Sequence, residues 1–198
     1  MLATSLFVVP TVSGLVAGVA RADDTVTHPG DHMRYAVEIE PHLEFAWGNW
    51  GDGGVVGGGV GYGAGIRFAI PIVQNGFVPS INNSVAIGFG LDFLHFGCDA
   101  NFAGLGNYNC DVNSLSFPVV LQWNFYVSKY WSVFGEPGLF LYHDFVDVSC
   151  NGRGCVLPNE TSVLPALYVG GRYKLNNRLA FTMRVGYPTI TLGLSFFD

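Results

Sequence analysis

A strict two-residue alternation runs through "YAVEIEPHLEFAWG", residues 35–48. Its odd positions carry mainly large apolar side chains, and its even positions carry alanine and four polar residues: Glu38, Glu40, His42 and Glu44. Successive side chains of a β-strand point to opposite faces, so this segment presents one apolar and one charged face. A helix would mix the two sets, and Pro41 would break it. The pattern predicts a long strand.

The same alternation recurs in seven further segments, at 60–72, 85–93, 115–127, 131–142, 163–175, 179–187 and 190–197. In the segment at 131–142 the alternation is less regular, because Phe134 and Phe140 fall on the otherwise polar face. A shift of one residue would exchange its two faces, so the sequence leaves open which face of this strand points into the barrel. Short turns at 128–130 and 176–178 alternate with longer connections at 48–58, 97–114 and 143–162. We predict eight strands, with short turns at one end and long loops at the other, as is typical of outer-membrane barrels.

Two kinds of barrel have period-two strands. A soluble ligand-binding barrel turns its apolar side chains inward, whereas a membrane barrel turns them outward. The apolar face here carries far more bulky side chains than the interior of an eight-stranded barrel can hold. We therefore predict an all-β, eight-stranded antiparallel up-and-down transmembrane β-barrel.

The aromatic residues support that choice, because they cluster towards the two ends of the strands, as at bilayer interfaces. One cluster contains Tyr35, Trp123, Tyr130, Trp131 and Tyr173, and the other contains Trp47, Trp50, Phe93 and Tyr187.

Composition agrees with a membrane location. Of the 198 residues, 49% are hydrophobic and only 12% are charged, against about 25% charged in typical soluble domains. The net charge of −6 argues against a nucleic-acid partner. Residues 1–22 end in "ARA" after an apolar run, which predicts a cleaved signal peptide, with a membrane-anchoring helix as the alternative. A polar periplasmic lead-in at 23–33 and the barrel at 34–198 would follow.

The polar face of the predicted barrel carries nearly balanced charges. Its acidic residues are Glu38, Glu40, Glu44, Asp92 and Glu136, its basic residues are Arg67, Arg172, Lys174 and Arg184, and His42 lies among them. Charges inside a narrow lumen must be paired and hydrogen-bonded. We predict a lumen charge network of these residues; the alternative is a charged sheet face exposed to solvent.

The four cysteines fall in two of the long connections, Cys98 and Cys110 in 97–114 and Cys150 and Cys155 in 143–162. Three pairings are formally possible, but a disulfide within each loop needs the least rearrangement and requires an oxidising compartment. The cysteine spacing does not suit zinc. His28 and His32 are spaced as metal ligands can be, but a disordered lead-in is the favoured interpretation. We expect no cofactor and no metal.

Residues 34–198 resemble the small eight-stranded outer-membrane proteins of Gram-negative bacteria, the OmpA-barrel and OmpX-like group. The resemblance lies in the architecture. The C-terminal "TITLGLSFFD" also looks like the assembly signal read by the outer-membrane insertion machinery, with Gly193 and Phe196 suitably spaced, although the chain ends in Asp198. The resemblance implies an integral outer-membrane protein in contact with lipids and, during assembly, with that machinery.

Four functions are compatible with these features. The favoured one is a non-enzymatic barrel with a filled lumen, acting in envelope integrity or surface interaction through disulfide-braced loops 97–114 and 143–162. One alternative is a narrow ion pathway gated by Glu40, Glu44, Arg67 and Arg184. Another is a lipid-modifying or proteolytic enzyme, whose candidate rim residues are His95, Asp99, His143, Asp144 and Ser149, without a family motif. The last is a soluble ligand-binding barrel.

Overall fold

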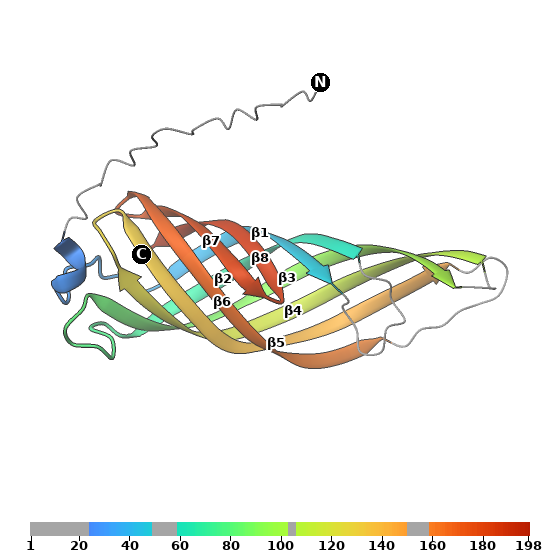
Figure 1. Ribbon diagram of the computed structural model, residues 1–198, viewed down its shortest axis with the longest axis horizontal. Helices are drawn as coiled ribbons and strands as arrows, with labels where there is room; N and C mark the ends of the chain where they lie inside the picture. Colours follow the sequence, from blue (N-terminus) through green and yellow to red (C-terminus); the bar gives the residue numbers. More distant parts are fainter. Residues whose placement is uncertain (1–23, 49–58, 103–105, 150–158) are drawn as a thin grey trace, which may run out of the picture.

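The structure, a computed structural model, describes residues 24–48, 59–102, 106–149 and 159–198. A short 3-10 helix, η1 (Asp24–Thr27), precedes the eight strands β1 (Glu38–Gly48), β2 (Gly59–Val73), β3 (Asn83–Phe102), β4 (Gly106–Tyr126), β5 (Trp131–Ser149), β6 (Glu160–Asn176), β7 (Leu179–Tyr187) and β8 (Thr189–Phe197). Each strand pairs antiparallel with the next, and β8 pairs with β1, which closes the barrel (Figure 1). The predicted eight-stranded up-and-down barrel is confirmed.

Within the described residues, no helix has the length and hydropathy needed to cross a bilayer. The predicted signal peptide and the alternative N-terminal anchor fall on residues 1–22, which lie outside the described part of the chain.

Every strand carries large apolar side chains that point away from the barrel. Exposed apolar examples, one from each strand in order from β1 to β8, are Leu43, Ile70, Phe93, Leu121, Leu139, Val169, Met183 and Leu194. One buried polar side chain per strand is Glu44, Arg67, Asp92, Gln122, Glu136, Arg172, Arg184 and Ser195. This is the facing of a barrel surrounded by lipid, because a soluble barrel would bury the first set and expose the second. The soluble-barrel and exposed-charge alternatives are therefore wrong.

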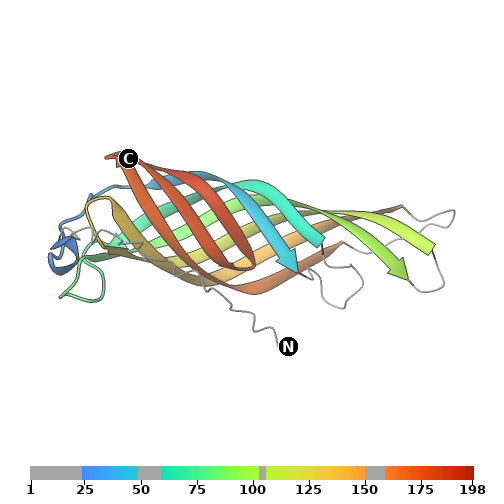
Figure 2. The ribbon, with the colours of Figure 1, turned by 45° about the horizontal axis from the view of Figure 1, so that its top comes forward.

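Four central strands are longer than the sequence pattern predicts. Within the segments at 97–114 and 143–162, expected to be loops, residues 97–102, 106–114, 143–149 and 160–162 continue β3, β4, β5 and β6, with pairs such as Phe102↔Gly106 and Asp144↔Glu160. The two-residue alternation fades there, so the sequence pattern does not mark these strand ends, although the backbone pairing continues. These strands project past the rim formed by β1, β2, β7 and β8 (Figure 2).

The predicted disulfides fall partly in this projecting sheet. Cys98 and Cys110 are direct Cα partners in the register of β3 and β4. Directly opposed antiparallel residues lie about 4.5–5.5 Å apart at Cα, within the range that a disulfide bridges. The bond between this pair stays a prediction, and Cys150 and Cys155 lie outside the described residues.

The facing of β5, which the sequence left open, is resolved by burial. Phe134 and Phe140 lie inside the barrel with Ser132 and Glu136, and Val133 points outward. The ring of Phe134 lies 4.3 and 5.1 Å from the guanidinium carbons of Arg172 and Arg184, which explains an aromatic side chain among charges. Phe140 belongs to a buried apolar cluster with Val120, Tyr142, Ala166 and Tyr168.

Aromatic side chains also mark the two ends of the apolar band. At the short-turn end, Trp131 and Tyr173 are in contact at 4.9 Å, and Trp123 packs against Phe125 at 5.0 Å. Towards the other rim, exposed rings include Phe93 and Tyr187. The side chain of Trp47 and the whole of Trp50 lie outside the described part. The described rings occupy the places where bilayer interfaces favour aromatic residues.

Candidate functional site

The centre of the barrel interior is organised around Glu136 of β5. Its Oε2 accepts hydrogen bonds from Arg184 Nε at 2.9 Å and Arg67 Nη1 at 3.3 Å, and its Oε1 accepts one from Gln122 Nε2 at 2.7 Å. Arg184 also donates to Glu40 Oε1. All five side chains are almost completely buried. Glu136 thus links two guanidiniums from β2 and β7.

A second cluster lies nearer the short-turn end. Arg172 holds Glu38 in a bidentate pair, Nε to Oε1 at 2.9 Å and Nη2 to Oε2 at 2.8 Å, and donates to Asn124 Oδ1 at 2.6 Å. Ser195 Oγ donates to Glu38 Oε1 at 2.6 Å and contacts Thr182 Oγ1 at 2.6 Å. A bidentate guanidinium–carboxylate pair is among the stronger interactions available inside a protein.

The third cluster lies towards the long-loop rim. Asp92 of β3 sits between Arg67, whose Nη2 is 3.5 Å from Oδ2, and His42, whose Nε2 is 3.2 Å from Oδ1. Glu44 lies beside them and is fully buried, and its carboxylate interacts with the Thr189 hydroxyl but accepts no hydrogen bond of good geometry. Together the three clusters draw at least one polar side chain from each of the eight strands.

The interior is more acidic than the sequence pattern suggested. Nine of the ten predicted network residues are buried inside the barrel, but Lys174 lies apart and lines a pocket at the short-turn end. The buried network therefore has five carboxylates against three guanidiniums, a formal difference of −2 with His42 neutral. Some positive charge, as protons or a bound cation, is needed to balance it.

Sequence reasoning missed several neutral members of the network. Gln122, Asn124 and Ser195 each hydrogen-bond a charged side chain, and Thr182 contacts Ser195. The ring of Tyr168 lies 5.4 Å from the guanidinium carbon of Arg67. The sequence signal for these residues was their position on the polar face of strands in which apolar and polar side chains alternate. That signal places a residue inside the barrel but does not identify its partner.

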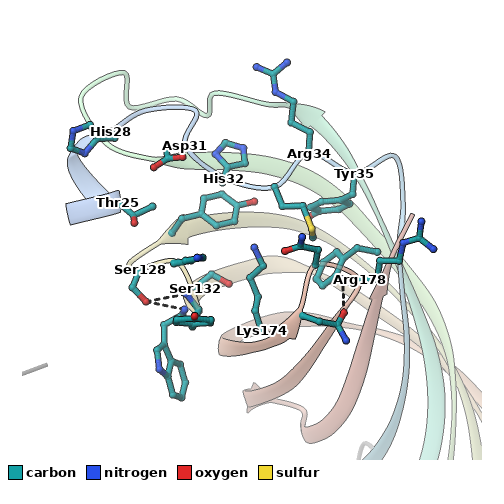
Figure 3. A pocket seen from close by; sticks show the side chains of 18 of the residues that line it. Thr25, His28, Asp31, His32, Arg34, Tyr35, Ser128, Ser132, Lys174 and Arg178 are labelled. Carbon is teal, nitrogen blue, oxygen red and sulfur yellow. Dashed lines mark hydrogen bonds between the residues drawn. The ribbon is translucent and has the colours of Figure 1, made fainter. Parts of the chain in front are cut away.

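A pocket of about 810 Å³ opens at the short-turn end (Figure 3). Its basic residues are Arg34, Lys129, Lys174 and Arg178, and its acidic residues are Asp31 and Asp198. Lys174 reaches into the pocket from β6, whereas Arg34 extends away from it (Figure 3). The excess of basic side chains would favour an anionic group over a cation at this end.

The lead-in segment forms one wall of this pocket and is docked rather than disordered. Asn82 N donates to Val26 O and Asn82 Nδ2 donates to Asp31 O, both at 2.8 Å. The His32 ring stacks on Tyr126 with centroids 4.2 Å apart and hydrogen-bonds through Nδ1 to Asn82 Oδ1 at 2.5 Å. The expectation of disorder is therefore wrong for residues 24–33, because these contacts join tertiary partners that the sequence alone does not reveal.

His32 is the titratable group of the docked segment. Burial lowers the pKa of His32, and the nearby cations Arg34 and Lys174 act in the same direction, whereas its hydrogen bond to Asn82 opposes them. The docked segment thus favours the neutral imidazole over the imidazolium.

The candidate rim histidines have neutral partners. His95 Nδ1 contacts Asn113 Oδ1 at 3.0 Å, and His143 Nδ1 contacts Thr161 Oγ1 at 2.6 Å. A nucleophile–base pair of the usual kind also needs a third group that orients the base, commonly a carboxylate. The side chains of Asp99 and Ser149 lie outside the described part, so these two candidates stay untested.

The closed eight-stranded barrel, apolar outside and polar inside, has the fold of the small outer-membrane β-barrels. Among solved structures, the Neisserial surface protein A shares 12% identity with a TM-score of 0.52, and the alignment covers 82% of this chain and 97% of that one. The attachment invasion locus protein Ail of Yersinia pestis, in complex with the heparin analogue sucrose octasulfate, gives a TM-score of 0.49 at 12% identity, covering 83% and 99% of the two chains. No family model and no curated protein matches the sequence.

Proposed function

We propose that this chain is an integral protein of a Gram-negative outer membrane that acts without catalysis, in envelope integrity or in contacts at the cell surface. The observation that carries the proposal is the outward apolar band around an interior of ion pairs and hydrogen bonds to which all eight strands contribute a polar side chain. Strands of 9–11 residues suffice to cross a bilayer, and β1, β7 and β8 have 11, 9 and 9. The band would contact lipid directly.

The interior is proposed to be closed to general diffusion. Arg67, Glu136 and Arg184 are each at most 1% exposed, which would not be so beside a wide water-filled channel. The apolar cluster around Phe140 and Tyr168 fills a further part of the interior. An interior of this kind supports a structural or surface role over that of a porin.

The projecting sheet is the proposed contact surface. β3 and β4 have 20 and 21 residues, about twice the length that a bilayer requires. Short turns mark the periplasmic end of such barrels, so the projection would lie outside the cell, and a disulfide between Cys98 and Cys110 would brace it. The proposed contact surface is thus a paired β-ribbon instead of the disulfide-braced loops expected from the sequence.

Two measurements test this proposal. The protein refolded in detergent should migrate differently in dodecyl sulphate gels before and after boiling, and it should stay silent in planar bilayers. An epitope inserted at 103–105 should bind antibody on intact cells, whereas one placed before Asp31 should bind only after permeabilisation. A barrel with no heat shift would refute membrane insertion, and reversed labelling would refute the orientation. Steady currents that change in the Glu44→Gln and Arg67→Gln variants would instead favour the gated pathway.

A further inference from the structure

His42, Gly65 and Asp92 lie in a row across β1, β2 and β3, because His42 pairs with Gly65 and Gly65 pairs with Asp92. A Cβ atom on Gly65 would lie 2.1 Å from Asp92 Oδ1 and 2.8 Å from His42 Nε2. Glycine therefore leaves the space in which the two side chains meet. Glu44 adds a carboxylate two residues along β1, and one donor atom from each of His42, Glu44 and Asp92 lies within 4.8 Å of the others.

The hydrogen bonds of this cluster do not use the nitrogen and oxygen atoms that could ligate a metal ion. His42 Nδ1 is 3.2 Å from the Glu40 carbonyl, an acceptor that places the ring proton on Nδ1. The lone pair of Nε2 then faces Asp92 Oδ1 at 3.2 Å, and neither atom has a hydrogen-bond partner. Neither oxygen of the fully buried Glu44 accepts a hydrogen bond of good geometry, although its carboxylate interacts with the Thr189 hydroxyl. Three groups that can each ligate a cation thus converge in one buried place.

We propose that His42, Glu44 and Asp92 bind a divalent transition-metal ion, for which Zn²⁺ fits best. One imidazole nitrogen and two carboxylates form a ligand set that zinc accepts. Two ligands at Zn–N and Zn–O distances of about 2.0–2.1 Å in a tetrahedral site lie about 3.3 Å apart. The observed separation of 3.2 Å between Nε2 and Oδ1 matches that spacing.

The surroundings support a metal centre in two further ways. The Glu40 carbonyl on Nδ1 and Arg67 beside Asp92 are partners of the kind that orient metal ligands. A divalent ion would also balance the formal charge of −2 that results from five buried carboxylates and three buried guanidiniums. The ion would tie β1 to β3 across β2. This proposal does not depend on the surface role proposed above.

The competing arrangement uses protons instead of a metal. In it, His42 is an imidazolium paired with Asp92, and Glu44 carries a proton. Both arrangements neutralise the interior, so zinc binding by the folded protein distinguishes them.

The test uses the full chain refolded in detergent, with cysteine thiols alkylated so that they cannot bind metal. The protein is stripped with a chelator, equilibrated with Zn²⁺, dialysed against metal-free buffer and analysed for bound zinc. We expect stoichiometric zinc and a higher unfolding midpoint with zinc than without. His42→Gln and Glu44→Gln should each weaken zinc binding more than about tenfold, in line with known effects on metal sites.

Two matched controls remove a histidine elsewhere. His143→Gln, at the rim, and His32→Gln, in the short-turn pocket, should keep zinc affinity unchanged. The heat-dependent gel shift confirms that each variant is folded before zinc is measured. Absence of zinc in the folded native protein would overturn the proposal in favour of the proton arrangement. Retention of zinc in both His42→Gln and Glu44→Gln, or its loss in His32→Gln, would overturn it by placing the metal elsewhere.

Discussion

Replacing Glu136 by glutamine tests whether the interior network stabilises the barrel. The substitution keeps the shape but removes the charge that Arg67 and Arg184 share, and one carboxylate oxygen becomes an amide group that can only donate. If the amide nitrogen faces the guanidiniums, donors meet donors at 2.9 and 3.3 Å. If it faces Gln122, donors meet at 2.7 Å. Either orientation breaks part of the network.

The expected cost follows from the bonds lost. Hydrogen bonds to charged groups are each worth about 1.5–3 kcal/mol, and breaking a buried ion pair costs about 3–5 kcal/mol. Arg184 keeps Glu40 and Arg67 keeps Asp92, so neither cation is left unpaired. We therefore expect Glu136→Gln to lower the free energy of unfolding by about 3 kcal/mol, at the lower end of that range.

Glu44→Gln is the matched control, because it makes the same change on the same face of the barrel. Glu44 has no counterpart to the bonds of Glu136: its carboxylate interacts with the Thr189 hydroxyl but accepts no hydrogen bond of good geometry. In zinc-free buffer we expect the free energy of unfolding to stay equal or to rise. Destabilisation by Glu136→Gln but not by Glu44→Gln would distinguish a specific network from a general dependence on interior charge.

The assay is urea unfolding of the protein refolded into lipid vesicles, followed by tryptophan fluorescence and by loss of the unboiled gel band. Both probes should give the same midpoint if unfolding is two-state. A Glu136→Gln variant within about 0.5 kcal/mol of the unsubstituted protein, the usual range for surface changes, would refute the reasoning. Equal destabilisation by both variants would also refute it.

Three further predictions concern other parts of the chain. Burial lowers the pKa of His32 below 6.5 in the docked segment, so the released segment binds more protons than the docked one. Docking should therefore weaken as the pH falls below 6.5. Proteolysis of residues 24–37 should accelerate at about pH 5 in the unsubstituted protein but not in His32→Gln. Gly65→Ala should cost about 1–3 kcal/mol in urea unfolding by displacing Asp92, and unchanged stability would contradict the close approach seen here. Peptide mass analysis without reductant should find Cys98 joined to Cys110, and free thiols at both positions would exclude that bond.

Much of the fold could be predicted from local pattern. Alternation fixes which side chains share a face, and the volume of the apolar set decides which face is inside. The far ends of β3, β4 and β5 could not be predicted, since alternation marks a strand only where its two faces lie in different environments. The interior aromatic residues Phe134 and Phe140 were ambiguous for a related reason: a ring packed against guanidiniums or other rings is stable on a polar face.

The partners within the candidate site were beyond the sequence. Glu40 and Arg67 are direct neighbours in the register of β1 and β2, which would suggest that they form an ion pair. The closest carboxylate contact of Arg67 is instead Glu136 at 3.3 Å, and Glu40 binds Arg184. Long side chains in a narrow barrel reach across the axis, so contacts depend on strand tilt and shear as well as on register.

The sequence by itself determined that the chain forms strands, that they number eight, and that one face is apolar and the other charged. These properties follow from side-chain period and volume, which are local. Only the tertiary structure decided that Arg172 meets Glu38, 134 residues away, and that His42 and Asp92 converge over Gly65. Closing the barrel brings β6 within reach of β1, and no local pattern encodes the distance between two side chains across that interior.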